Sequence, residues 1–68
     1  MNDHVYKTIE ITGSSPQGPA EAVRIAIERA SKTMKNMRWF KVTEIRGAVD
    51  EGKIGYWQVT IQLGLTLE

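Results

Sequence analysis

The C-terminal part of this chain alternates between apolar and polar side chains. One set consists of Trp57, Val59, Ile61, Leu63, Leu65 and Leu67, and the other of Tyr56, Gln58, Thr60, Gln62 and Thr66. Successive side chains of a β-strand point to opposite faces of the sheet, so this alternation predicts a strand with one apolar and one polar face. A sheet that contains this strand has one side for a core and one side that stays polar.

A strand and a helix are expected in the first half of the chain. Residues 5–12 alternate and are rich in β-branched side chains, which is typical of a strand. Residues 13–19 are mostly turn formers, and Pro19 suits the first position of a helix. From residue 20 to about Asn36, apolar residues recur at helical spacing, which predicts an amphipathic helix. Its apolar stripe consists of Val23, Ala26, Ile27, Ala30, Met34 and Met37.

The second half of the chain predicts a hairpin of two strands. Asp50, Glu51 and Gly52 stand between two β-rich runs, as a short hairpin loop requires. The expected order is therefore strand, helix, strand, strand, which is an α+β fold of the βαββ type. Its three-stranded antiparallel sheet has one helix packed on one face, and residues 1–68 form a single domain.

The first strand of this hairpin changes register along its length. Its apolar residues share one parity before Thr43 and take the opposite parity from Ile45 onward. A β-bulge near Thr43 or Glu44 would return Ile45 to the core side of the sheet. The same bulge would put Arg46 on the outer face together with Trp39.

The sheet face that the helix leaves uncovered has a mixed composition. It is expected to carry Tyr6, Trp39, Tyr56, Gln58 and Gln62 among threonines and charged residues. Aromatic rings next to uncharged hydrogen-bonding groups suit an interface or a ligand better than a solvated surface. A tryptophan at this position is, on its own, either an anchor for packing or a stacking surface.

A chain of 68 residues without cysteine has few ways to become stable. A domain of this size buries only roughly 60% of the surface of its unfolded chain. Disulfides are excluded, one histidine without cysteine cannot build a structural zinc site, and no acidic cluster has the spacing of a calcium loop. Self-association is therefore the expected source of additional stability.

Charge and hydropathy exclude several classes of partner. The net charge of +1 comes from 9 basic and 8 acidic residues scattered along the chain, so nucleic-acid binding is not favoured. No apolar run approaches the roughly 20 residues of a membrane span, and the N-terminus does not resemble a signal peptide. The chain also has no nucleophile beside a base and no metal constellation. We expect a soluble, cytoplasmic protein that is not an enzyme.

Several segments, taken in order, closely resemble the dodecin family. They are Val5–Ser15, Ala22–Ile27 with Ala30–Thr33, Arg38–Val42 with Glu44–Gly47, and Tyr56–Val59. The likeness covers almost the whole chain, and the length of the chain matches the family as well. It implies a hollow homo-dodecamer, in which βαββ subunits pair to hold flavins in antiparallel couples.

The resemblance also implies roles for three residues of the outer face. Trp39 matches the tryptophan that stacks on the isoalloxazine ring, and Gln58 matches the glutamine that hydrogen-bonds its polar edge. An indole offers a large rigid π surface, and a carboxamide offers both a donor and an acceptor. Arg46 matches a basic position of bacterial-type members, and we take it as a partner for the ribityl or phosphate portion, which favours FMN over riboflavin.

The resemblance further implies a role in storing and buffering flavin and in protecting it from light. Two flavins stacked between indoles should lose photoexcitation by rapid electron transfer, and this needs no catalyst. Some bacterial members also bind coenzyme A through basic residues close to the C-terminus. The segment Leu65–Glu68 has no basic residue, so coenzyme A stays a minor alternative.

Two readings from other classes stay open. In the first, the chain is a purely structural subunit of a homo-oligomeric shell, whose sheet face is buried against its copies. In the second, Tyr6, Trp39 and Tyr56 stack the bases of single-stranded nucleic acid, against which the balanced charge argues. The visible absorbance of the purified protein separates the flavin reading from both.

Overall fold

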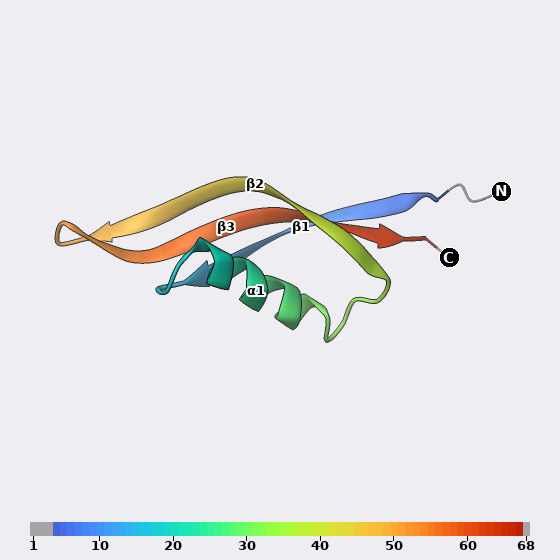
Figure 1. The fold of residues 1–68 in the computed structure, drawn as a ribbon, viewed down its shortest axis with the longest axis horizontal. Coiled ribbons are helices and arrows are strands. Elements are labelled where there is room, and N and C mark those ends of the chain that lie inside the picture. Colours follow the sequence, from blue (N-terminus) through green and yellow to red (C-terminus); the bar gives the residue numbers. More distant parts are fainter. Residues whose placement is uncertain (1–3, 68) are drawn as a thin grey trace.

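The computed structural model describes residues 4–67 of the chain (Figure 1). The elements follow the order β1 (Tyr6–Ser15), α1 (Pro19–Ala30), β2 (Met37–Asp50) and β3 (Lys53–Thr66). The three strands form one antiparallel sheet in the order β1-β3-β2, so the C-terminal strand lies in the middle. The predicted βαββ arrangement with a single helix is confirmed.

The core lies between α1 and the apolar face of the central strand. It consists of Ala22, Ala26 and Ala30 from the helix and Val59, Ile61 and Leu63 from β3. Small residues on the helix let it approach the sheet closely. At Gly13 of β1 a Cβ atom would overlap the backbone oxygen of Ala22 and lie 2.9 Å from Cβ of Ala26, so the helix packs against bare backbone there.

The predicted end of the helix is wrong. The helix ends at Ala30 rather than near Asn36, and a turn follows in which the amides of Thr33 and Met34 donate to the carbonyl oxygen of Ala30. Asn36 has a positive φ of 67°, which no helix continues through. Met37 begins β2 instead of extending the helix, yet it packs against the core. The helical spacing of apolar residues thus continues beyond the end of the helix, because the side chains after Ala30 still pack against the core although the backbone is no longer helical.

Strand β1 is longer than the predicted segment 5–12. Gly13, Ser14 and Ser15 were expected in a turn, but they extend the strand by pairing with residues 57–59 of β3. Pairing with a central strand satisfies their backbone groups, and this outweighs their intrinsic preference for turns.

The hairpin and the bulge follow the prediction. Glu51 and Gly52 have φ angles of 51° and 77°, so both central residues of the two-residue turn are left-handed, as the twist of a tight hairpin favours. The register shifts between Val42 and Glu44, which is the bulge expected near Thr43. Ile45 pairs with Val59 and therefore returns to the core side.

The helix covers only part of the apolar face. It packs against β1 and β3, and Figure 1 shows β2 running beyond the helix toward the hairpin. Phe40, Val42 and Ile45 share the core side of β2 and are 49%, 42% and 53% exposed. The radius of gyration of 14.2 Å exceeds the about 11 Å of a compact chain of this length. One subunit therefore leaves apolar surface that another molecule can cover.

No helix in residues 4–67 has both the length and the apolar character that crossing a membrane requires.

Candidate functional site

The face of the sheet opposite α1, here called the outer face, collects the polar and aromatic side chains. Cross-strand partners share a face, and the outer pairs of β2 and β3 are Trp39 with Gly64, Lys41 with Gln62, Glu44 with Thr60, and Arg46 with Gln58. From β1 the same face receives Tyr6, Thr8, Glu10, Thr12 and Ser14. The hydroxyl oxygens of Thr12 and Thr60 lie 2.9 Å apart across two strands.

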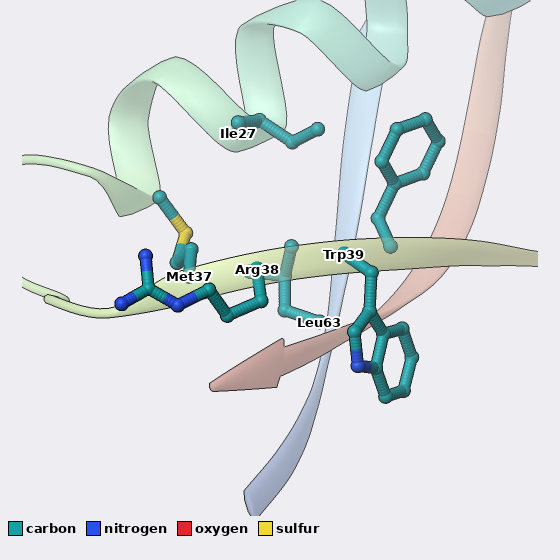
Figure 2. A pocket seen from close by; sticks show the side chains of 6 residues that line it. Ile27, Met37, Arg38, Trp39 and Leu63 are labelled. Atoms are coloured by element: carbon teal, nitrogen blue, oxygen red, sulfur yellow. The ribbon is translucent and has the colours of Figure 1, made fainter. Parts of the chain in front are cut away.

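Trp39 lies on the outer face and not beneath the helix. Figure 2 shows Ile27 of α1 on one side of β2 and the indole of Trp39 on the other. The indole is 39% exposed and meets the ring of Tyr6 edge-on, with centroids 5.9 Å apart and an angle of 68° between the planes. An indole held at its edge and open on one side is a suitable surface for stacking.

The indole rests on Gly64 of the central strand. A Cβ atom at Gly64 would overlap Cε2, Cζ2 and Nε1 of Trp39, so the ring occupies the place of a side chain there. Gly64 is buried beneath it. Gly64 was not among the residues predicted from the sequence to form the site. The available signal was a glycine inside an otherwise regular strand, which often marks a close approach.

Arg46 and Gln58 are joined by a hydrogen bond. Nε of Arg46 donates to Oε1 of Gln58 at 3.0 Å, and Nη1 of Arg46 lies 3.3 Å from Oε1 of Glu44. The bond turns the carboxamide oxygen toward Arg46 and its nitrogen away, so the nitrogen can donate to a ligand. Arg46 is thereby tied to Gln58 and Glu44 within its own subunit.

The structure does not bring Trp39 and Gln58 together within one chain. Trp39 lies opposite Gly64 and Arg46 lies opposite Gln58, so the two parts of the outer face are six residues apart along β3. At about 3.3 Å per residue, this separates them by roughly 20 Å. The outer face therefore has an aromatic end at Trp39 and a polar end at Gln58.

A pocket of about 250 Å³ opens on the helix side of the sheet (Figure 2). Its lining residues are Ile27, Met37, Arg38, Trp39, Phe40 and Leu63. The indole of Trp39 points away from it, to the outer face. The pocket thus belongs to the apolar surface that the short helix leaves uncovered.

Titratable and metal-binding groups add little to the outer face. Residues 4–67 contain no group of three histidine, cysteine or acidic side chains that could hold a metal ion. The pKa of Glu21 is lowered by a hydrogen bond from Arg24, but this pair lies on the exposed surface of α1. Of the three residues expected in a ligand site, Trp39 forms the aromatic end, and Arg46 and Gln58 form the polar end.

Comparison with known proteins gives a consistent result. A family model described as Dodecin matches residues 5–68. The curated dodecin of Thermus thermophilus is 41% identical over 64 residues, which cover 94% of this chain and 93% of that protein. The solved dodecin of Streptomyces coelicolor superposes with a TM-score of 0.93 at 44% identity, covering 100% of this chain and 97% of the other. The dodecin of Streptomyces davaonensis has a TM-score of 0.91 at 43% identity, with 98% of both chains covered. The chain therefore belongs to the dodecin family.

Proposed function

We propose that this protein binds flavin, with FMN preferred over riboflavin, and that it stores and buffers the cofactor and protects it from light. The observation that carries the proposal is the indole of Trp39. It is 39% exposed on the face opposite the helix, backed by Gly64 and held at its edge by Tyr6. Such a surface suits a flat aromatic ring that a second molecule can close from the other side.

The spacing of the outer face supports a site shared between copies of the chain. A ring that stacks on Trp39 within one subunit ends well short of Gln58, because about 20 Å of strand separates their positions. A neighbouring subunit in antiparallel orientation can bring its own Gln58 to the polar edge of that ring. Two rings would then lie between two indoles, one from each subunit.

Self-assembly is part of the same proposal. Phe40, Val42 and Ile45 on the core side of β2 are between 42% and 53% exposed, and the chain is elongated, with extents of 55 × 21 × 14 Å. Burying this surface against further copies supplies the stability that one small core lacks. The family's hollow dodecamer is the assembly that we propose.

Arg46 and Gln58 are proposed to bind the ligand as a unit. The Gln58 carboxamide would donate to an acceptor on the pyrimidine edge of the flavin, since its oxygen accepts from Arg46. The guanidinium keeps further donors for the ribityl or phosphate portion, and this favours FMN. Because the Arg46 guanidinium is hydrogen-bonded to the Gln58 carboxamide, the two side chains would shift together when the ligand binds.

Photoprotection follows from stacking and does not require a catalytic group. An excited flavin in contact with an indole takes one electron from the indole. The electron then returns to the indole, so the flavin is not reduced overall. The excitation is lost before slower photochemistry begins. The protein would therefore act as a binding protein, whose task is fulfilled by the complex itself.

A titration with FMN tests the proposal. The purified full chain should be yellow or become so, and it should quench the fluorescence of added FMN to saturation. The same titration with single-stranded oligonucleotide, at low and high salt, tests base stacking, and one with coenzyme A tests the minor alternative. A colourless protein that assembles but leaves FMN fluorescence unchanged would establish the empty shell instead.

Mixed assemblies test whether the site is shared. Trp39→Ala and Gln58→Leu subunits, carrying different tags, are co-expressed and the mixed assemblies are isolated. A shared site predicts that the mixture binds FMN more tightly than either pure variant, because some sites join an intact Trp39 to an intact Gln58. Affinity no better than that of the two pure variants would place both contacts in one subunit.

A further inference from the structure

A glycine stands on the outer face of the central strand, where the regular alternation would place a polar side chain. Gly64 pairs with Thr8 of β1 on one side and with Trp39 of β2 on the other. A glycine weakens the interior of a strand, because it loses more conformational freedom and has no side chain to pack. Its presence at this point in β3 therefore calls for a compensating contact.

The contact is the indole of Trp39, which lies across the β3 backbone. Any Cβ atom at Gly64 would overlap Cε2, Cζ2 and Nε1 of the indole. Beyond the glycine, the indole meets Tyr6 of β1 at 5.9 Å between ring centroids. The side chain of one edge strand thus crosses the central strand at its only bare position on this face and reaches the other edge strand.

We propose that Gly64 is the positioning residue of the flavin site and sets the depth of the slot in which the ring stacks. This inference rests on the proposed function. With no side chain beneath it, the indole lies against the sheet, and the space above it is left for the ligand. A methyl group at Gly64 would lift the indole away from the backbone into the volume that a stacked ring must occupy, since stacked atoms need about 3.5 to 4.0 Å of separation.

Tyr6 contributes the second constraint on the indole. An edge-on ring on β1 limits the rotation of the indole about its side-chain bonds, while Gly64 fixes its height. Both constraints act inside one subunit, before any ligand or partner arrives. A surface that is placed in advance loses less entropy on binding than one that must be ordered by the ligand.

The opposing explanation is purely structural. An aromatic side chain that covers a glycine from a neighbouring strand stabilises a sheet by itself, with no ligand involved. The two explanations differ in what Gly64→Ala changes. A structural role predicts loss of stability with unchanged FMN affinity of the folded protein, and a positioning role predicts loss of affinity in protein that is still assembled.

The experiment compares Gly64→Ala with a matched control on the same strand. Gly55→Ala is the control, because a Cβ atom at Gly55 meets its nearest neighbour, Cβ of Asp50, at an ordinary 3.4 Å. Each full-length variant is checked for assembly by light scattering and titrated with FMN by fluorescence quenching. The near-ultraviolet circular dichroism of the unliganded protein reports the indole environment.

We expect Gly64→Ala to assemble, to change the near-ultraviolet signal, and to lose roughly 5-fold to 150-fold in FMN affinity, the range of one aromatic stack. Gly55→Ala should bind like the unmodified protein. In a Trp39→Ala background, Gly64→Ala should have no further effect on affinity, because the indole that it displaces is already gone.

Three results would overturn the inference. One is wild-type affinity in an assembled Gly64→Ala protein. Another is an equal loss caused by Gly64→Ala with and without Trp39. The third is failure of Gly64→Ala to fold, whether or not the double variant folds, because the glycine would then serve the sheet itself. If the unmodified protein does not bind FMN at all, the proposed function fails instead, and the titration of that protein shows this separately.

Discussion

Nε of Arg46 donates a 3.0 Å hydrogen bond to Oε1 of Gln58 across the β2–β3 pair. The two side chains therefore do not contribute to the outer face independently. Arg46 fixes which way the carboxamide points, and Gln58 holds a guanidinium that its ion pair with Glu44 also orients. A change at either residue alters what the other presents to a ligand.

Coupling between Arg46 and Gln58 should be measurable in FMN affinity. Gln58→Leu should weaken FMN binding by about 1 kcal/mol for each hydrogen bond lost. Arg46→Leu alone should weaken it more, because the contact to the phosphate is lost and the Gln58 carboxamide is no longer held in place. We expect the double variant to lose less than the sum of the two single losses. The control is Gln17→Leu in the loop before α1. Additive losses would show that the two side chains act separately.

Removing the indole should have the largest single effect on binding. Trp39→Ala deletes the stacking surface and should weaken FMN binding by at least about 1 to 3 kcal/mol. Quenching of the residual bound flavin should also fall, since the electron donor is gone. Trp57→Phe serves as the control, because Trp57 pairs with Gly47 and Ser15 on the helix side of the sheet. Equal losses in both variants would contradict a stacking role specific to Trp39.

The exposed apolar side of β2 should mediate self-assembly. Ile45 is 53% exposed, and an aspartate there would place a charge on surface that we expect to be buried between copies. Ile45→Asp should shift the protein from a large assembly to smaller species in light scattering or sedimentation. Thr33→Asp, at an exposed position after the end of α1, is the control, because it adds the same single negative charge. An unchanged assembly would place the subunit contacts elsewhere.

Close packing of α1 on β1 depends on Gly13. A methyl group there would overlap the carbonyl oxygen of Ala22 and crowd Cβ of Ala26. Gly13→Ala should therefore lower the free energy of unfolding by about 1 to 3 kcal/mol, the usual range for overpacking. Denaturant unfolding at a fixed protein concentration measures this, because assembly makes stability depend on concentration. Gly55→Ala, where a methyl group fits, should be close to neutral.

Acid should remove a small part of the stability of α1. A hydrogen bond from Arg24 is the main cause that holds the pKa of Glu21 below its ordinary 4.5. A carboxylate whose pKa is lower in the folded state than in the unfolded state stabilises the fold at pH values above its unfolded-state pKa. This stabilisation is lost as the pH falls through the folded-state pKa. Between about pH 5 and pH 3, Glu21→Gln should lose less stability than the unmodified protein. Salt should reduce the difference, because the pair lies at the surface of α1, with Arg24 exposed and Glu21 partly exposed.

Local periodicity explains what could be predicted. The alternation along the strands, the helical spacing after Pro19 and the turn residues 50–52 were enough to infer the βαββ order. The parity change before Ile45 predicted the bulge and the outer placement of Arg46 together with Trp39. The same reasoning extended the helix past Ala30, because Met34 and Met37 keep packing against the core after the helix has ended. A periodic pattern reports burial, and burial does not require that the backbone stay helical.

The sequence by itself determined which side chains share a face, because side-chain direction repeats every two residues along a strand and needs no knowledge of the partner strand. Only the tertiary structure decided which residues meet across the sheet. The seating of Trp39 on Gly64, the bond between Arg46 and Gln58, and the distance between these two ends of the face all depend on the register of β2 against β3. Register is set by the turn at residues 51 and 52 and by three irregularities along the pair, and each irregularity moves every later pairing.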